Sequence, residues 1–305
     1  MITKEQIAER KNGLFATDAA PALGMSKYRT PVAVWLEKTG QAEPEDLSNI
    51  EAVQMGNFME PHIAALYRER LGVRLDPLPV TLYHPKHSFM GSHFDYVAPG
   101  KKLVEIKNFS AMRRKEFGEN GSKEVPMDVL IQCIHEATVF QTEEIDVAVL
   151  FGGQEFCVFP LQIDPAASVK LVEMEEEFWR KCVIERAAPE PRTTEETRRL
   201  FPHDDGETIL VTADVYADVN DLRRVRKSIA ELEEIEESLK ARIQAFMGYH
   251  STLVTHENEV LTTWKRSKAS KTFDKAAFEK QHPALYASFV KDVEGSRRFL
   301  LKGRS

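Results

Sequence analysis

The chain contains little cysteine and no long apolar run. Its three cysteines, Cys133, Cys157 and Cys182, are widely spaced and form no Cys-x-x-Cys pair. This spacing argues against a disulfide framework and against zinc or iron–sulfur sites, so we expect buried thiols of a reducing compartment. No apolar segment reaches the ~20 residues that a membrane-spanning helix needs, and the first residues are too polar for a signal peptide. We therefore expect a soluble, cytoplasmic protein with no membrane partner.

The chain also lacks an overall excess of positive charge, because its formal net charge is -7. Nucleic-acid-binding proteins contact phosphates through Lys and Arg, so the net charge alone argues against such a partner. The distribution is uneven, however, since residues 262–305 contain eleven Lys and Arg against four Asp and Glu. An acidic body with a basic C-terminal end suggests contact with a polyanion, although a solvated terminal face explains it as well.

The order of predicted elements indicates the fold class. At 305 residues the chain is long enough for one large core and a smaller module. Helical spacing predicts helices at 31–40, 50–71, 127–140 and 165–186, and apolar runs predict strands at 79–83, 89–96, 103–106, 145–151 and 155–161. Strands mixed with helices favour an α/β or α+β fold, in which helices flank a central mixed sheet.

A change of composition near residue 190 divides the chain. We interpret the Pro-rich, polar residues 191–208 as a linker between a domain at 1–190 and a C-terminal module at 209–305. Apolar residues from Leu222 to Phe246 recur every three or four positions, which predicts a long amphipathic helix with a near-heptad seam. Such a seam pairs with another helix, either within the module or in a second subunit. After it we expect a hairpin at 253–265, helices within 273–293 and a final strand at 297–301.

The segment from Asp95 to Lys107 carries a pattern with chemical meaning. Nine residues separate Asp95 from the triplet Glu105-Ile106-Lys107, which ends an apolar, β-branched run. If this run is a strand, alternation places Glu105 and Lys107 on one face. The Pro99-Gly100 turn returns the chain, so that Asp95 converges on the same site across a hairpin. Two carboxylates beside an ammonium group suit Mg²⁺ and a phosphate.

Residues outside the hairpin add to this pattern, which is too short to be decisive alone. Glu60 lies in the expected helix 50–71 and is a helix-borne acid that can face the hairpin. Gln132 and His135 share the polar side of the expected helix 127–140. Among the nearby histidines only His93, two residues before Asp95, is expected close to the site. We interpret both histidines as structural rather than metal-binding.

This ordered set resembles the PD-(D/E)XK nuclease superfamily, and more narrowly the YqaJ-like viral recombinases, which are alkaline exonucleases related to that of bacteriophage lambda. The resemblance covers about residues 8–185. Its motifs are R-x(5)-A-S, with threonine here in place of serine, then G-x(3)-E, the D-x(n)-E-x-K core and Q-x-Q-H/Y, whose second glutamine is replaced by Ile134. The matching residues are Arg10, Ala16, Thr17, Gly56, Glu60, Asp95, Glu105, Lys107, Gln132 and His135.

The resemblance implies a Mg²⁺-dependent 5′ to 3′ exonuclease, with Mn²⁺ as a substitute ion. It implies that Asp95, Glu105 and the main-chain carbonyl of Ile106 bind the metal. Glu60 would then support a second ion or orient its water. Lys107 would hold or deprotonate the attacking water. The remaining catalytic position is Gln132, which would orient the nucleophile or the scissile phosphate.

The resemblance also implies the substrate and the partners. Linear double-stranded DNA would be digested to leave 3′ single-stranded tails for phage-type recombination, with a single-strand annealing protein as partner. Arg10 and the Thr17 hydroxyl would bind the terminal 5′-phosphate, because a guanidinium group suits that ligand. A ring-shaped homo-oligomer is expected, with a trimer favoured.

Three other interpretations stay open on the sequence. The same core can serve an endonuclease of a restriction or repair type, which cuts closed circular DNA. A noncatalytic DNA-binding recombination scaffold keeps the fold without turnover. A coiled-coil interaction protein would instead use the seam at 222–246 as its main functional surface.

Overall fold

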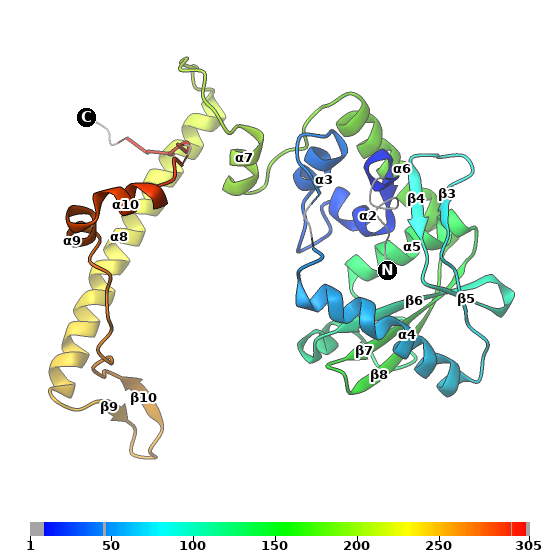
Figure 1. Ribbon diagram of the computed structural model, residues 1–305, viewed down its shortest axis with the longest axis horizontal. Coiled ribbons are helices and arrows are strands. Elements are labelled where there is room, and N and C mark those ends of the chain that lie inside the picture. The colour runs from blue at the N-terminus through cyan, green and yellow to red at the C-terminus, as the bar shows by residue number, and fades with distance from the viewer. Residues whose placement is uncertain (1–8, 45–46, 294, 303–305) are drawn as a thin grey trace. The chain divides into compact units, whose positions relative to one another are not determined.

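The computed structural model describes residues 9–44, 47–293 and 295–302, and the chain divides into two compact units, Met1–Leu200 and Phe201–Ser305 (Figure 1). The helices of the first unit are η1 (Arg10–Asn12), α2 (Ala16–Ala22), α3 (Pro31–Lys38), α4 (Glu51–Leu71), η2 (Pro99–Lys101), η3 (Ala111–Glu116), α5 (Met127–Phe140), α6 (Pro165–Phe178), the π-helix η4 (Trp179–Ile184) and α7 (Thr194–Leu200). Its strands are β1 (Leu14–Phe15), β2 (Asp76–Pro77), β3 (Thr81–Tyr83), β4 (Met90–His93), β5 (Tyr96–Ala98), β6 (Lys102–Phe109), β7 (Glu144–Phe151) and β8 (Glu155–Gln162).

A five-stranded sheet forms the centre of the first unit. Its strand order is β2-β5-β6-β7-β8, and all neighbours are antiparallel except the parallel pair β6 and β7. The chain between those two strands includes α5, because parallel neighbours need a crossover connection. The expected α/β fold with a mixed sheet flanked by helices is therefore confirmed.

Strand alternation on β6 separates an apolar face from a polar one. Val104 and Ile106 pack with Ile63 and Tyr67 of α4 in one buried cluster. The opposite face of the sheet packs against α5, as the cluster containing Leu103, Val147, Val149 and Cys133 shows. Glu105 and Lys107 alternate with Val104 and Ile106, so they project from the α5 face. Figure 1 shows the helices α4 and α5 beside the strands of this sheet.

The strand expected at 89–96 is broken into two strands that belong to different sheets. β4 pairs with β1 and β3 in a three-stranded sheet, whereas β5 pairs with β6 in the central sheet. Phe94 is buried at the break and contacts the Phe140 ring, with centroids 5.3 Å apart. Pairing of β5 with β6 begins at Tyr96, which lies opposite Val104. Just before this pair, the Asp95 carboxylate accepts a hydrogen bond from the Ile106 N–H. Asp95 therefore stands in the gap between the sheets.

The region that we expected as a linker, 191–208, contains helix α7. Thr193 and Glu196 form a capping box, in which the Thr193 hydroxyl accepts from the Glu196 N–H and the Glu196 carboxylate accepts from the Thr193 N–H. The Glu196 side chain is buried and also accepts from the Arg192 N–H. The Arg192 guanidinium donates to the Gly24 carbonyl, so this segment packs on the first unit.

The second unit is built on one long helix. It contains α8 (Ala213–Met247), β9 (Thr252–Val254), β10 (Val260–Thr263), α9 (Lys275–Gln281) and α10 (Pro283–Phe289). α8 begins earlier than the expected 222, because the Thr212 side chain caps it at the Val215 N–H. The hairpin β9–β10 is confirmed. The strand expected at 297–301 is wrong, since these residues pair with no strand in the described part of the chain.

The described residues include no helix that is both long and apolar enough to cross a membrane.

Candidate active site

β6 presents the two charged groups of the Glu-x-Lys motif to α5. Glu105 is 5% exposed, and the Lys107 ammonium donates to Glu105 Oε1 over 2.6 Å. The hairpin that precedes β6 turns at Gly100, whose φ of 81° suits glycine. The register Tyr96↔Val104 then places Asp95 beside the chain between Glu105 and Ile106. The expected alternation and hairpin are both present.

Asp95 is fixed by its backbone surroundings. Its Oδ2 accepts from the Ile106 N–H over 2.9 Å, which ties the carboxylate to the strand that bears Glu105 and Lys107. Burial and then the neighbouring Glu105 carboxylate raise the pKa of Asp95 well above its ordinary value, whereas Lys107 opposes this change. The structure thus brings the three side chains of the predicted core into one electrostatic neighbourhood.

Gln132 of α5 bonds both members of the β6 pair. Its Nε2 donates to Glu105 Oε1 over 2.7 Å, and its Oε1 accepts from the Lys107 ammonium over 3.1 Å. These two contacts fix which way the amide points, because only the oxygen can accept from an ammonium group. Gln132 thus meets Glu105 and Lys107 at one site, as its match to the family motif led us to expect.

A fifth side chain, Glu136, belongs to the same cluster and was not foreseen from the sequence. Its side chain is only 2% exposed, and its Oε1 accepts from Gln132 Nε2 over 2.8 Å. Burial and then the Glu105 carboxylate raise the pKa of Glu136 well above its ordinary value. The signal that could have found it is its position four residues after Gln132, which places both side chains on one face of α5.

The charge balance of the cluster fits a divalent cation. The carboxyl groups of Asp95, Glu105 and Glu136 lie near one cationic side chain, Lys107. Burial and then the Glu105 carboxylate raise the pKa of Asp95 and of Glu136. Carboxylate oxygens are the ligands that Mg²⁺ prefers. Within the described residues, no three His, Cys, Asp or Glu side chains yet stand in metal-binding geometry, and Lys107 bonds Glu105 directly.

Lys107 is held as an ammonium group in this arrangement. Burial opposes its charge, but the Coulombic attraction and the hydrogen bond of Glu105 outweigh burial and raise the pKa of Lys107 above its usual value. Glu136 and Asp95 act in the same direction. The side chain is therefore suited to hold a phosphate oxygen or a water through its protons.

Glu60 approaches the cluster from the other side of the sheet. It lies on α4, is half-buried, and its charge contributes to the raised pKa of Asp95 and of Tyr96. These effects place its carboxylate near the gap in which Asp95 stands. Glu60 is thus an outer acid of the cluster, whereas on the α5 side Gln132 contacts Glu105 and Lys107 and is itself bonded to Glu136.

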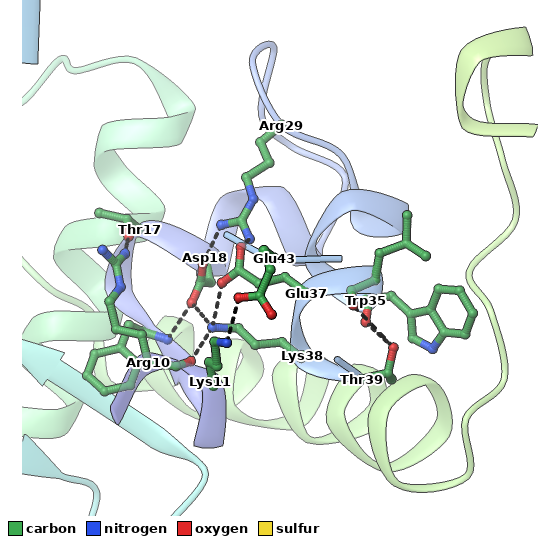
Figure 2. Close-up of polar contacts among 12 residues, drawn as sticks. Arg10, Lys11, Thr17, Asp18, Arg29, Trp35, Glu37, Lys38, Thr39 and Glu43 are labelled. Carbon is green, nitrogen blue, oxygen red and sulfur yellow. Dashed lines mark hydrogen bonds and ion pairs between the residues drawn. The ribbon is translucent and has the colours of Figure 1, made fainter. Parts of the chain in front are cut away.

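Arg10 and Thr17 form a separate polar pair at the start of the domain. The Arg10 guanidinium donates to the Thr17 hydroxyl (Figure 2). It lies 6.0 Å from the centre of the Phe15 ring. Thr17 is exposed, so the pair is open to a ligand. The two residues predicted to bind a 5′-phosphate are therefore brought together.

A buried ion-pair network lies beneath this pair and was also missed. Asp18 is 1% exposed and receives the Lys38 ammonium over 2.7 Å, the Arg29 guanidinium and the Phe15 N–H. Lys38 in turn donates to the main-chain carbonyl of Arg10 (Figure 2). Asp18 thus links the Arg10 backbone to helices α2 and α3. Nothing in the local sequence identifies this long-range contact.

Residues 7–143 match the family model of the YqaJ-like viral recombinase domain. This part of the chain is therefore similar to the YqaJ-like viral recombinase domain. The match confirms the family resemblance drawn from the motifs, and every residue of the acid cluster and of the Arg10–Thr17 pair falls inside it.

Similarity to the YqaJ group extends beyond this domain. The uncharacterized protein YqaJ of Bacillus subtilis (strain 168) is 27% identical over 318 residues, which span 99% of this chain and 95% of the relative. Among solved structures, an alkaline exonuclease (LHK-Exo) from Laribacter hongkongensis is 16% identical with a TM-score of 0.49, covering 60% of this chain and 94% of that chain. A phage-related exonuclease from Haemophilus somnus 129PT is 11% identical with a TM-score of 0.41, covering 57% and 96%.

Two histidines of the matched region, His135 and His93, are buried or partly buried and contact neighbouring side chains. His135 is fully buried, with Nδ1 2.9 Å from Glu175 Oε1 and Nε2 3.0 Å from the Gly91 carbonyl oxygen. The His93 ring packs on the Phe15 ring, with centroids 4.9 Å apart, so it lies on the side of Arg10. The contacts of His135 agree with its structural interpretation. Among the described residues, the buried His93 Nε2 has no hydrogen-bond partner.

Proposed function

We propose that the chain is a metal-dependent exonuclease that digests linear double-stranded DNA from 5′ to 3′ and leaves 3′ single-stranded tails. The observation that carries this proposal is the convergence of Asp95, Glu105, Lys107 and Gln132 on one site. Burial and then the Glu105 carboxylate raise the pKa of Asp95, so its ionised form lacks a compensating positive charge that a divalent cation would supply. Similarity to the YqaJ-like viral recombinase domain supports a role of the product in phage-type recombination.

Asp95, Glu105 and the main-chain carbonyl of Ile106 are the groups that would hold the metal. Glu60 would support a second ion or its water. The ion would be Mg²⁺, with Mn²⁺ as a substitute, because all of these ligands are hard oxygens. When bound, a divalent cation neutralises the charge that develops on the phosphoryl oxygens and lowers the pKa of its water.

Lys107 and Gln132 would handle the attacking water and the scissile phosphate. Lys107 is an ammonium group that donates its protons to Glu105 and Gln132. A metal ion on Glu105 would compete with that bond, leaving Lys107 to orient the water or a phosphate oxygen. Gln132 would fix the same water or phosphate through its amide, whose orientation Glu105 and Lys107 determine.

The Arg10–Thr17 pair supports recognition of a DNA end. We infer that Arg10 and the Thr17 hydroxyl bind the terminal 5′-phosphate, since a guanidinium group and a hydroxyl donate to phosphate oxygens. His93 lies on the Arg10 side and is two residues from Asp95, about 7 Å along an extended chain. This short step favours cleavage close to a bound end over cleavage within a duplex.

Two partners follow from the proposed reaction. A single-strand annealing protein would take up the 3′ tail, and a ring-shaped homo-oligomer, with a trimer favoured, would enclose the duplex.

Duplexes labelled at either end, with and without a 5′-phosphate, test the proposal in Mg²⁺, in Mn²⁺ and in EDTA. We expect metal-dependent release of nucleotides from the 5′ end, faster with the phosphate present, and no cutting of closed circular plasmid. Asp95→Ala and Lys107→Ala should abolish release, while Arg10→Ala should remove the preference for a 5′-phosphate. Nicking of the circle would favour the endonuclease. DNA binding by an equally inert wild type and Asp95→Ala would favour the noncatalytic scaffold.

A further inference from the structure

Helix α8 carries an apolar seam that the second unit leaves open. Along it, Val225, Ile229, Leu232, Leu239, Ile243 and Phe246 are between 43% and 79% exposed. A helix with a continuous apolar stripe normally buries that stripe against a partner, because an isolated helix gains little stability in water. The seam from Leu222 to Phe246 spans about 36 Å at the rise of an α-helix.

The seam follows a heptad repeat. The inward a and d positions are, in order, Leu222, Val225, Ile229, Leu232, Glu236, Leu239, Ile243 and Phe246. All but Glu236 are apolar, and Glu236 is paired with Lys240 of the same helix over 2.6 Å. A repeat kept over this length is typical of a two-stranded coiled coil rather than of a surface helix.

The charges flanking the seam are grouped by sign. Residues 223–227 contain four basic side chains, and residues 231–237 contain five glutamates. A parallel pair of such helices would place each block beside its own copy and Glu236 opposite Glu236, which is repulsive. An antiparallel pair would place the basic block of one helix beside the acidic block of the other. The charge pattern therefore favours the antiparallel orientation.

One antiparallel register pairs apolar layers with opposite flanking charges, and it places Glu236 opposite the partner's Val225 rather than opposite a second Glu236. If Ile229 lies opposite the partner's Leu232, then Leu222 lies opposite the partner's Leu239. The same register places Arg226 beside the partner's Glu233. Because a two-fold axis relates the copies, every contact occurs twice, as in an isologous interface.

The second set of flanking positions, the g positions of the heptad, agrees with this register. Asp221 falls beside the partner's Arg242, again with opposite charges. The remaining pair of this kind joins Ser228 to the partner's Ile235 and brings no like charges together. The axis would pass between Ala230 and Glu231, where the basic and acidic blocks meet. Such self-complementarity is what a second copy of this helix requires.

We propose that α8 pairs with α8 of a second copy of this chain as an antiparallel coiled coil. The occupant of the seam is thus the chain itself, in a two-fold arrangement independent of the nuclease site. If the first units also assemble into a ring, this contact joins rings in pairs and doubles the mass of the assembly.

Charge reversal in the full chain tests this proposal. The variants are Arg226→Glu, Glu233→Arg and the double variant, with Lys227→Glu and Glu234→Arg as controls on the outer f positions. Mass is measured by sedimentation equilibrium at low salt and again at high salt. We expect each seam variant to halve the mass and each control to leave it unchanged, while the double variant restores the wild-type mass.

Mixing the two single variants gives the sharpest readout. The glutamate introduced at position 226 of one variant would face the arginine introduced at position 233 of the other. The unchanged Glu233 of the first would face the unchanged Arg226 of the second, so two chains that fail alone should pair when mixed. A parallel pair predicts no such rescue, because Arg226 would then face the partner's Asp221. An unchanged mass in the single variants, or no recovery in the mixture and the double variant, would overturn the proposal.

Leu232→Asp tests whether the apolar seam pairs with another helix at all, whatever the orientation of that helix. If the proposed pair forms, Leu232→Asp should halve the mass, as Arg226→Glu and Glu233→Arg each should. A loss of mass in Leu232→Asp alone would show that another partner or orientation uses the seam. Nuclease activity and circular dichroism of each variant report whether the chain remains folded.

Discussion

At the scale of single residues, Glu136 is the group that the motif did not reveal. It accepts from the same Gln132 nitrogen that donates to Glu105, so it restrains the amide from the side opposite β6. Restraint of this kind acts on the geometry of the reaction rather than on substrate affinity. Glu136 is accordingly a positioning residue, which touches neither the phosphate nor the metal in the proposed mechanism.

Two substitutions of Glu136 distinguish the effect of its hydrogen-bond acceptor from the effect of its charge. Glu136→Gln keeps an oxygen acceptor for Gln132 and removes a buried carboxyl group, so we expect nearly normal kcat and equal or higher stability. Glu136→Leu removes the acceptor, and we expect kcat to fall about tenfold, which corresponds to about 1.4 kcal/mol, with little change in KM. Steady-state kinetics on linear duplex with melting curves measures both. Equal loss of kcat in the two variants would show that the charge itself is needed.

Asp18 makes a prediction about stability in acid. Burial alone would raise its pKa, but Lys38, Arg29 and Arg10 together lower it from 3.8 to about 2. A carboxyl group with a depressed folded pKa stabilises the fold fully above its unfolded pKa of 3.8 and loses that effect as pH falls toward 2. The change amounts to about 2 kcal/mol.

The measurement is the free energy of unfolding as a function of pH. Wild type should lose stability between pH 4 and 2 more steeply than Asp18→Asn, in which this carboxyl group does not titrate. At neutral pH, Asp18→Asn should cost about 3 kcal/mol, because the buried Lys38 ammonium keeps only the more distant Glu37 carboxylate, 3.6 Å away. Identical pH slopes in the two proteins would contradict the assignment. Glu43→Gln, which removes only the surface pair with Lys11, is the matched control.

At the scale of elements, the His135–Glu175 pair connects α5 to α6. His135 also donates through Nε2 to the Gly91 carbonyl of β4, because a carbonyl oxygen can only accept. Burial opposes a charged ring, but Glu175 outweighs it and raises the pKa of His135 above 6.5. The pair therefore fixes α5, which bears Gln132 and Glu136, relative to two other elements.

This pair predicts a loss of stability on the alkaline side. A histidine with a raised folded pKa stabilises the fold fully below its unfolded pKa of 6.5, and this effect is lost as pH rises through the folded value. We expect wild type to lose stability as pH rises above 6.5, and His135→Gln to lack that slope. His135→Ala should cost about 3–5 kcal/mol at pH 6, because Glu175 is left buried without its cation. The free energy of unfolding in urea, measured across this pH range, tests the prediction. An unchanged pH slope in His135→Gln would disprove it.

Local pattern predicted most elements of the first unit, because each depends on nearby residues. α3 begins at Pro31 with Thr30 as its cap, and α4 ends at Gly72 in the left-handed region, both as the sequence indicates. The break at Asp95 was missed, because it depends on which sheet each half of the segment joins. The α7 helix was missed although its signal is local. The prolines and charged residues of this segment suggested a linker, and the capping box of Thr193 and Glu196 was overlooked.

The site was predicted where it follows strand alternation and was missed where it depends on packing. Glu105 and Lys107 share a face because their spacing is two residues, which any strand enforces. Asp18 and Lys38 meet only because α2 and α3 fold together, and their separation in sequence carries no period. The same holds for the contact of Lys38 with the Arg10 carbonyl, which no motif describes.

At the scale of the whole molecule, the two units lead to different expectations for two truncated chains. The first unit has its own core, and its contacts continue to Leu200, where α7 ends. A chain ending at residue 205 should therefore keep folding and DNA cleavage while losing the α8 pairing. A chain ending at residue 190 removes Arg192 and the buried Glu196, whose contacts hold Gly24 and the start of α7.

The comparison of these two truncations locates the domain boundary. We expect the 1–190 chain to melt at a lower temperature than the 1–205 chain, by roughly 2–4 °C for each kcal/mol lost. Arg192→Ala in the 1–205 chain should reproduce part of that difference, because it removes only the bond to the Gly24 carbonyl. Equal melting temperatures for both truncations would place the boundary near 190 and make α7 dispensable. Loss of cleavage in the folded 1–205 chain would instead show that the second unit takes part in the reaction.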